Sequence, residues 1–172
     1  MKNLIKRLDF REAIDLVKDN SGGIDELDIG IYDSFPVVGL DQDTSHFTNL
    51  AWMLFGRYIA NNTVLKRVCL EDYDISDEHI SSLFRNMASN SHLEYIDLPR
   101  CTLTDSKLVA LFRGLTKSSS IKSLNLGQNA FGIDGIQSMM PFIENSPQLE
   151  SLWISGNDAN TIDTDGFELL MG

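Results

Sequence analysis

The sequence lacks any long hydrophobic run. No window approaches the roughly eighteen consecutive apolar residues that a membrane span requires. The N-terminus, MKNLIKRLDFREAIDLVKDN, is charged throughout, whereas a secretory signal peptide needs an apolar segment. These absences argue against a membrane or secreted protein, and we expect a cytoplasmic one.

Cysteine is scarce as well. Cys69 and Cys101 are the only two, and they belong to no CxxC motif and no His/Cys cluster. A disulfide framework of the kind found in small secreted domains is therefore excluded, and reduced thiols are expected.

Basic residues are few. The chain has 14 Lys+Arg against 25 Asp+Glu, which gives a net charge of -11. Such a charge repels phosphate backbones and anionic lipid headgroups, so we expect neither nucleic acid nor membrane as a partner. The rest of the composition is that of a soluble globular protein, with 42% hydrophobic and 23% charged residues among 172. Disorder, collagen and coiled coil are excluded, and the length suits a single domain.

Apolar residues recur at intervals of 28 positions, which predicts a repeat architecture. Each set has the alternation of a short strand that is buried on one side. The sets are Leu65, Val68, Leu70 and Ile75; Leu93, Ile96, Leu98 and Leu103; and Ile121, Leu124, Leu126 and Phe131. A fourth set begins on schedule with Leu149, Leu152 and Ile154, followed by Asn157, but about three extra residues precede Ile162, which takes the place of Phe131.

A helical pattern follows each predicted strand, with apolar residues at i, i+3, i+4 and i+7. Ser76 and Thr104 stand where helix N-caps belong. Stacked units would form a parallel sheet covered on one side by helices. The helical sets are Trp52, Phe55, Gly56 and Ile59; Ile80, Leu83, Phe84 and Met87; Leu108, Leu111, Phe112 and Leu115; and Ile136, Met139, Met140 and Ile143.

The segments LKRVCLEDYDI, LEYIDLPRCTL, IKSLNLGQNAF and LESLWISGNDA resemble the leucine-rich repeat consensus LxxLxLxxN/CxL. A period of 28 with a helix in each unit is similar to the ribonuclease-inhibitor-like class. The resemblance covers 65–172 and extends weakly over 24–64. It implies an α/β fold, a horseshoe-shaped solenoid with a concave parallel β-sheet and convex α-helices, and most often protein binding.

Two residues depart from the pattern. Tyr73 occupies the Asn/Cys position that Cys101, Asn129 and Asn157 fill in later units. In the family this Asn forms a ladder to loop backbone, so we expect the turn at Tyr73 to be looser or packed differently. Pro141 falls within the last complete helix pattern, where it should kink or shorten the helix near Met140.

The first predicted strand has two possible frames. Ile24, Leu27 and Ile29 reproduce the strand spacing, whereas Val37 and Leu40 keep the strict period but place a glutamine at an apolar position. We prefer the first frame, which makes 31–46 a long loop. The opening segment, with Phe10, Ala13, Ile14 and Val17 after an Asp9 N-cap, reads as a capping helix.

We therefore expect one domain over 1–172, ending partway through a helix. Either it is a fragment of a longer array, or its last unit is covered by a partner, which includes self-association through that uncapped unit. The expected parts are an N-terminal capping helix at 1–23, an irregular first repeat at 24–64, regular repeats at 65–92, 93–120 and 121–148, and a partial last repeat at 149–172.

No catalytic motif is present: GxSxG, HExxH, GxxxxGK[ST] and GxGxxG are all absent. Asp163-Thr164-Asp165-Gly166 fails as a calcium loop, because Thr161 would stand first and Glu168 eighth. His79 and His92 read as surface residues, while His46 follows Asp41 and Asp43 in a weak candidate cluster for a hard metal or acid/base chemistry. We expect no enzyme, no cofactor and no metal.

In each strand the residues flanking the middle apolar position should point away from the core. Tyr95 and Trp153 are the main candidate anchors for a partner, although both could instead pack on neighbouring strands. Arg67 could form an internal ion pair. One column holds Glu26, Arg67, Tyr95, Ser123 and Ser151, and the other holds Asp28, Cys69, Asp97, Asn125 and Trp153. The candidate partner-binding residues are Glu26, Asp28, Arg67, Cys69, Tyr95, Asp97, Asn125 and Trp153.

The segment EDYDISDE concentrates negative charge at 71–78. This acidic rim would attract a partner with a basic surface, or it could be a solvated edge. Its residues are Glu71, Asp72, Asp74, Asp77 and Glu78.

The leading hypothesis is a protein-protein interaction module that binds a protein or peptide on the concave face and acidic rim. One alternative is a regulator of a small GTPase, with Arg67 or Asn125 reaching toward the partner's nucleotide. Another is a structural segment of a longer array.

The repeat pattern makes a prediction about stability. If units stack at intervals of 28, Leu98→Ala or Leu126→Ala removes core contacts and should lower the free energy of unfolding by about 2–5 kcal/mol. Urea denaturation measures this. A change below about 1 kcal/mol would contradict the stacking.

Overall fold

The computed structural model describes residues 14–15, 17–18, 26–30 and 49–157. Residues 14, 15, 17 and 18 are helical, and from β1 onward strands alternate with helices. The elements are β1 (Glu26–Gly30), α2 (Asn49–Asn61), β2 (Arg67–Glu71), α3 (Asp77–Phe84), the short 3-10 helix η2 (Met87–Ser89), β3 (Tyr95–Asp97), α4 (Asp105–Leu115), β4 (Ser123–Asn125), α5 (Ile133–Glu144) and β5 (Ser151–Trp153).

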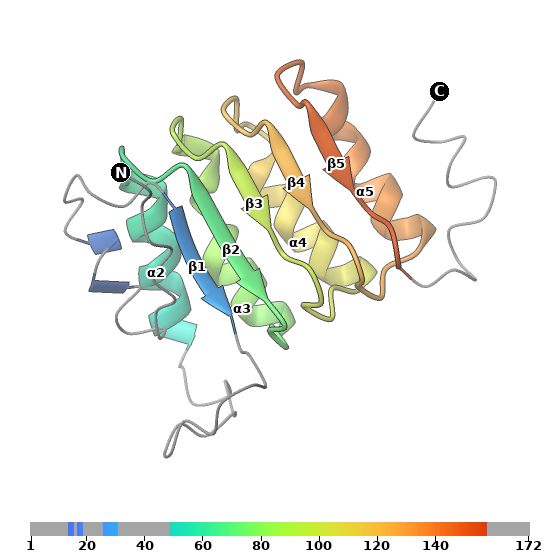
Figure 1. Cartoon of the computed structure of the whole chain (residues 1–172), viewed down its shortest axis with the longest axis horizontal. Helices are drawn as coiled ribbons and strands as arrows, with labels where there is room; N and C mark the ends of the chain where they lie inside the picture. Colours follow the sequence, from blue (N-terminus) through green and yellow to red (C-terminus); the bar gives the residue numbers. More distant parts are fainter. Residues whose placement is uncertain (1–13, 16, 19–25, 31–48, 158–172) are drawn as a thin grey trace, which may run out of the picture.

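The five strands form one parallel sheet in chain order, β1 to β5 (Figure 1). Arg67 pairs with Tyr95, Tyr95 with Ser123, and Ser123 with Ser151, so neighbouring units align at the sequence interval of 28. The predicted α/β class with a parallel sheet is confirmed. Leu27 pairs with Val68, which confirms the preferred frame of the first strand.

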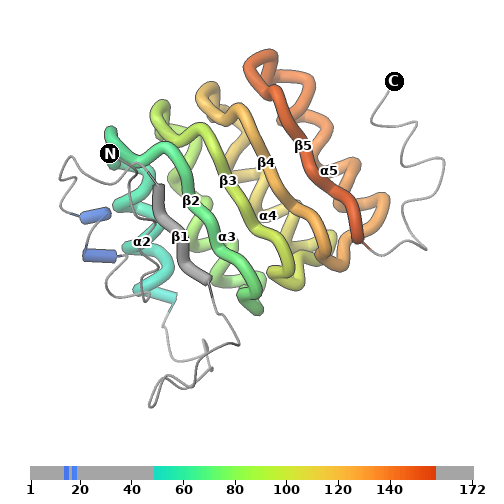
Figure 2. The backbone as a smooth tube through the Cα atoms, in the orientation of Figure 1, coloured from blue at the N-terminus to red at the C-terminus, as the bar shows by residue number. Residues whose placement is uncertain are grey.

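Helices α2 to α5 cover one face of the sheet, and the hydrophobic core lies between the two layers (Figures 1 and 2). The middle residue of each of β3 and β4 is fully buried, and the residues on either side are only partly buried. Every apolar residue of the first three predicted strand sets is buried. On the other face, the described part of the chain places no helix, and we call it the open face.

Two glycines bring the helices close together. A Cβ at Gly56 of α2 would lie 2.1 Å from the carbonyl oxygen of Leu83, and a Cβ at Gly114 of α4 would lie 2.2 Å from that of Phe84. Both carbonyls belong to α3, so any side chain at either glycine would collide with backbone. The backbones of α2 and α4 therefore approach α3 on both sides only because these positions have no Cβ.

Buried polar side chains link the turns that follow the strands. The Asn129 side chain accepts hydrogen bonds from the Cys101 and Leu103 amides, at 2.8 and 3.0 Å, and donates to the Leu98, Leu126 and Gly127 carbonyls. Asn157 accepts from the Asn129 amide at 2.8 Å, and the Cys101 thiol donates to the Leu70 carbonyl at 3.0 Å. We call this series the Asn129 ladder.

Tyr73 ends the Asn129 ladder, as its sequence position predicts. Its ring is buried and packs edge-on against Trp52, with centroids 5.7 Å apart. The turn is thus packed differently rather than left loose. Cys69 and Cys101 are both free thiols, and burial raises the pKa of Cys101 to about 12, so its role here is structural.

A second ladder, which sequence reasoning missed, lies where the helices return to the strands. The Asn90 side chain accepts from the His92 and Leu93 amides, at 2.9 and 2.6 Å, and donates to the Ile59 carbonyl at 2.8 Å. Asn62, 28 positions earlier, accepts from the Val64 and Leu65 amides in the same way. We call this pair the Asn90 ladder. Its signal in the sequence was the interval shared by Asn62, Asn90, Ser118 and Ser146, all of them buried.

The helix ends match the sequence expectations in part. Ser76 caps α3 by accepting from the His79 amide at 3.2 Å, whereas Thr104 occupies the N-cap of α4 without that bond. Of the two effects expected at Pro141, a kink or a shortening, the shortening is wrong, because α5 continues to Glu144. Only the last turn follows the proline, and the Asn145 side chain bonds the Pro141 carbonyl at 2.7 Å, which closes that end of the helix.

The close approach at Gly114 predicts that a Gly→Ala change in this helix lowers the free energy of unfolding, which is the opposite of its usual effect. Gly→Ala within a helix normally stabilises it by up to about 1 kcal/mol. At Gly114 the added Cβ would force α3 and α4 apart, so Gly114→Ala should lower the free energy of unfolding by about 1–3 kcal/mol. Thermal and urea denaturation provide the measurement. Val109→Ala on the exposed side of α4 is the control, and a Gly114→Ala variant more stable than the wild type would refute the argument.

Candidate functional site

The open face carries the side chains that the sequence pattern placed there. The register brings the two predicted columns into two rows across the sheet. The side chains of Glu26 and Asp28 lie outside the described part of the chain, although the backbone of β1 holds both residues in line with the rows. The described members are Arg67, Cys69, Tyr95, Asp97, Ser123, Asn125, Ser151 and Trp153.

One half of the open face, on β2 and β3, is charged and internally paired. The Arg67 guanidinium lies 4.6 Å from the centre of the Tyr95 ring and 3.3 Å from an Asp97 carboxylate oxygen. Tyr95 is only partly exposed. Arginine, tyrosine and aspartate thus form one cluster, held by a cation–π contact and an ion pair. Of the two explanations considered for Tyr95, packing on neighbouring strands fits this geometry.

The other half, on β4 and β5, is uncharged and carries an exposed tryptophan. Trp153 is 58% exposed, and its indole nitrogen donates to the Ser151 hydroxyl at 2.7 Å, which fixes the ring orientation. Ser123 and Asn125 occupy the paired positions on β4. The Asn125 side-chain oxygen is used locally, because it accepts from the Gly127 amide at 3.1 Å. An exposed aromatic among small neutral side chains suits an apolar or aromatic group of a partner.

A row of alternating charge lies just before the strands. Glu94 accepts from Lys66 at 2.8 Å and from Lys122 at 2.7 Å. Hydrogen bonds from Lys122 and then from Lys66 lower the pKa of Glu94. The same contact with Glu94 raises the pKa of Lys122. These charges therefore join neighbouring units to one another.

The acidic rim is largely engaged by its own chain. Arg100 bonds Asp72 at 2.5 Å, contacts Glu71, and reaches Gln128 at 3.0 Å. Asp74 accepts from Thr102 at 2.6 Å, and Asp77 accepts from Ser106 at 3.0 Å. The hydrogen bond from Arg100 lowers the pKa of Asp72. Glu78, the remaining member, accepts from Asn49, so the rim is a bonded edge with one arginine at its centre.

Left-handed backbone places Arg100 in this position. Asp72, Arg100 and Gln128 have φ of 57°, 54° and 57°, and Gly156 follows at 75°, always at the turn after a strand. Side-chain-bearing residues rarely adopt this conformation. Here it stacks one side chain from each turn, so that Arg100 lies between Asp72 and Gln128.

The structure leaves fewer candidate residues for a metal site or for acid/base chemistry. Among the described residues, no three His, Cys, Asp or Glu side chains are grouped so as to hold a metal ion. His79 was expected at the surface, but it stacks on Trp52 with ring centroids 5.3 Å apart. His46, Asp41, Asp43 and the 163–166 segment lie outside the described residues. No helix among the described residues has the length and apolar character needed to cross a bilayer.

Comparison with known proteins finds structures with a similar fold but assigns the chain to no family. No family model matches the chain, and no curated protein has significant sequence similarity to it. Leiomodin-1 actin-binding site 2 (ABS2) has a similar structure, with a TM-score of 0.68 and 15% identity over 96% of this chain and 87% of that one. The tropomodulin C-terminal domain of Caenorhabditis elegans is also similar, with a TM-score of 0.56 and 14% identity over 95% and 74%.

These similarities correct the family expected from the sequence. The ribonuclease-inhibitor-like assignment is wrong, because the similar structures are domains of leiomodin and tropomodulin. The physical reason is that strand and helix periodicity records how units pack. Different families of α/β repeats share that packing, so periodicity fixes the architecture more closely than the family.

The Glu94 network makes stability depend on pH. Its folded pKa is lower than the ordinary value of 4.5, so its contribution is present above that value and is lost as the pH falls toward the folded pKa. Glu94→Gln should therefore be less stable than the wild type at pH 7, and the difference should shrink below about pH 4.5. Urea midpoints at pH 7 and pH 3 test this, with Glu144→Gln at the exposed end of α5 as the control. A Glu94→Gln deficit equal at both pH values would contradict the assignment.

Proposed function

We propose that this chain is a non-enzymatic protein-binding module whose partner docks on the open face, centred on Trp153. The observation that carries the proposal is a 58% exposed tryptophan on a patch without charged side chains. An anchor of this kind, once covered by a partner, supplies a large share of binding energy. The paired charges of Arg67 and Asp97 would then border the contact and select the orientation of the partner.

Actin is the first partner to test. The structural similarity to leiomodin-1 actin-binding site 2 extends over 96% of this chain, and it supports a protein-binding role for the same architecture. At 15% identity the similarity does not carry over individual contacts. We therefore choose actin as the candidate partner because of the similar structure, and we choose the candidate contact residues from the open face of this chain.

The shape and location follow from the same proposal. We infer that the domain is a leucine-rich-repeat-like solenoid, with the open face concave, the helices convex, and the expected division of 1–172 into a cap, an irregular unit and regular units. Concave parallel sheets are extended binding surfaces in such proteins. With a partner of this kind, we infer a cytoplasmic location for the protein.

The small-GTPase alternative gains no support from Arg67. An arginine that completes a partner's nucleotide site has to extend away from its own protein. The Arg67 guanidinium instead contacts Tyr95 and Asp97, and the Asn125 oxygen binds the Gly127 amide. No specific observation favours this second function.

The anchor is tested by comparing two aromatic residues of one face. Trp153→Ala should weaken binding by about 2 kcal/mol or more, roughly thirtyfold in Kd. Tyr95→Ala should weaken it less, because Tyr95 is already engaged by Arg67. Affinities are measured by cosedimentation with actin filaments and by titration against labelled actin monomers.

Trp153→Phe is the conservative control and should retain part of the affinity, while circular dichroism verifies that each variant is folded. Wild-type protein that binds neither form of actin would reject actin as the partner. Binding that a folded Trp153→Ala variant leaves unchanged would reject the open-face anchor.

A further inference from the structure

The outer surface of the helical layer, opposite the open face, has its own ordered pattern. The four helices lie side by side in chain order (Figure 1), and contacts such as Asn49 to Glu78 and Ser106 to Asp77 link neighbouring helices at a sequence interval of 29. Outward-facing residues at equivalent positions of the four helices therefore form rows across the layer. Successive rows lie about one helical turn apart.

Three such rows can be defined. The acidic row holds Leu50, Glu78, Ser106 and Asp134; the middle row holds Met53, Ser81, Val109 and Gln137; and the arginine row holds Arg57, Arg85, Arg113 and Pro141. All members of the acidic and arginine rows are exposed. Glu78 and Asp134 are thus the negative members of the acidic row, the middle row is neutral, and the arginine row carries three positive side chains.

The arginine row differs in its contacts from most other basic side chains of the described chain. In the part of the chain that the structure describes, Arg57, Arg85 and Arg113 form no ion pair. Five other basic side chains are each within 4.0 Å of a carboxylate: Lys66, Arg67, Arg100, Lys107 and Lys122. Arg85 is the C-cap of α3 and Arg113 lies in the last turn of α4, where a helix C-terminus favours a nearby cation. The guanidinium groups of the arginine row are available to a partner.

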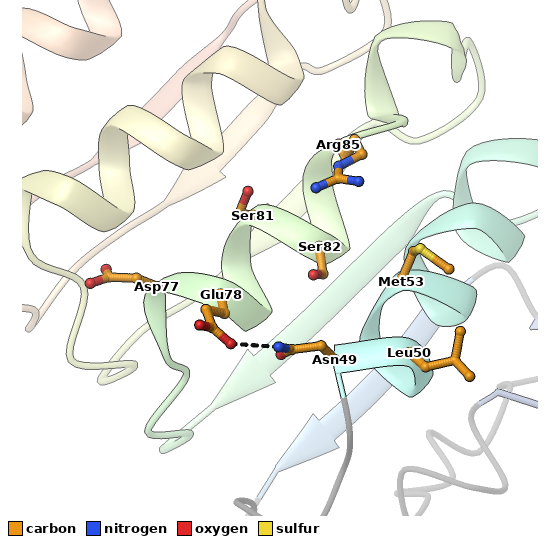
Figure 3. A pocket seen from close by; sticks show the side chains of 8 residues that line it. All are labelled: Asn49, Leu50, Met53, Asp77, Glu78, Ser81, Ser82 and Arg85. Atoms are coloured by element: carbon orange, nitrogen blue, oxygen red, sulfur yellow. Dashed lines mark hydrogen bonds between the residues drawn. The ribbon is translucent and has the colours of Figure 1, made fainter.

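A shallow groove between α2 and α3 crosses the three rows (Figure 3). It encloses about 640 Å³, with Leu50 and Met53 along α2 and Ser81 and Ser82 along α3. Asp77 and Glu78 lie at one end and Arg85 at the other. Leu50 is 58% exposed, and Val109 of the middle row is 42% exposed. These are two of the three large apolar side chains that the described chain exposes.

The rows are complementary to themselves. When a second copy faces the first across a two-fold axis along the middle row, the helices of the two copies run antiparallel. The arginine row of each copy then faces the acidic row of the other. Arg85 lies opposite Asp77 and Glu78, and the symmetry makes this contact twice. The other facing pairs are Arg57 with Leu50, Arg113 with Ser106, and Pro141 with Asp134. The middle row meets itself, bringing together Met53, Ser81 and Val109 of both copies. Such a contact is isologous and closes as a dimer.

We propose that the outer helical face is a homodimer interface whose occupant is a second copy of this chain. Charge complementarity between Arg85 of each copy and Asp77 and Glu78 of the other sets the antiparallel arrangement. The exposed apolar side chains of the groove and the middle row supply the area that becomes buried. Because each copy carries a net charge of -11, long-range repulsion keeps the association weak.

Sedimentation equilibrium from about 10 to about 300 µM covers the range for a small, weak interface. The wild-type mass should rise from 19.3 kDa toward twice that value. Arg85→Glu should raise the dimer Kd at least about tenfold, because it places like charges opposite one another. The double variant Arg85→Glu/Glu78→Arg keeps the net charge and exchanges the two signs, so it should restore dimerisation.

Lys18→Glu changes the net charge as Arg85→Glu does, but from outside the three rows, and it should leave the dimer intact. Circular dichroism verifies that each variant is folded. A wild-type protein that remains monomeric throughout overturns the proposal and leaves this face to a different acidic partner. A dimer that persists in Arg85→Glu, or that the double variant fails to restore, also overturns it and assigns self-association to another surface.

Discussion

The fold depends on giving hydrogen-bond partners to backbone groups at both ends of very short parallel strands. Strands β3, β4 and β5 have three residues each, so much of the backbone in each unit lies in turns, outside both the sheet and the helices. The Asn129 ladder and the Asn90 ladder bond these turns across neighbouring units. A buried backbone group without a partner costs about 1–3 kcal/mol, and the Asn129 side chain alone serves five such groups.

This constraint also determines which charges are available for recognition. Because the ladders hold each unit in register with the next, side chains 28 positions apart come within bonding distance, and on the sheet side they pair. Lys66, Glu94 and Lys122 form one such series, and Arg100 joins two turns in the same way. Charges used between units contribute little to selecting a partner. Within the described ranges, Trp153 and the arginine row lack such pairing, which is why both candidate surfaces are built from them.

The sequence predicted what depends on packing and missed what depends on hydrogen bonding. The interval between Val68, Ile96 and Leu124 gave the register, since a shift of one residue would expose every buried side chain. Asn62 and Asn90 were missed because a polar residue before a strand is typical of a loop. Only the interval of 28 positions between them indicates a repeated role. The pairing of the acidic rim within its own chain was missed for a related reason. Its pairing depends on the left-handed conformation of Arg100, which no side-chain pattern reveals. Trp153 and Tyr95 were indistinguishable in the sequence. The structure separates them, because Arg67 lies over the Tyr95 ring while Trp153 is 58% exposed.

The two candidate surfaces, the open face and the outer helical face, lie on opposite sides of one thin layer of sheet and helix. This placement determines how the two surfaces would act together. Docking through the outer helical face would leave both open faces uncovered and pointing away from each other. A dimer of this kind would present two Trp153 sites on opposite sides, so it could link two partner molecules, or two positions of one assembly whose spacing fits. Linked sites raise the effective concentration for the second contact without any new interaction. A weak dimer could therefore bind a repeating partner more tightly than its single sites bind an isolated one.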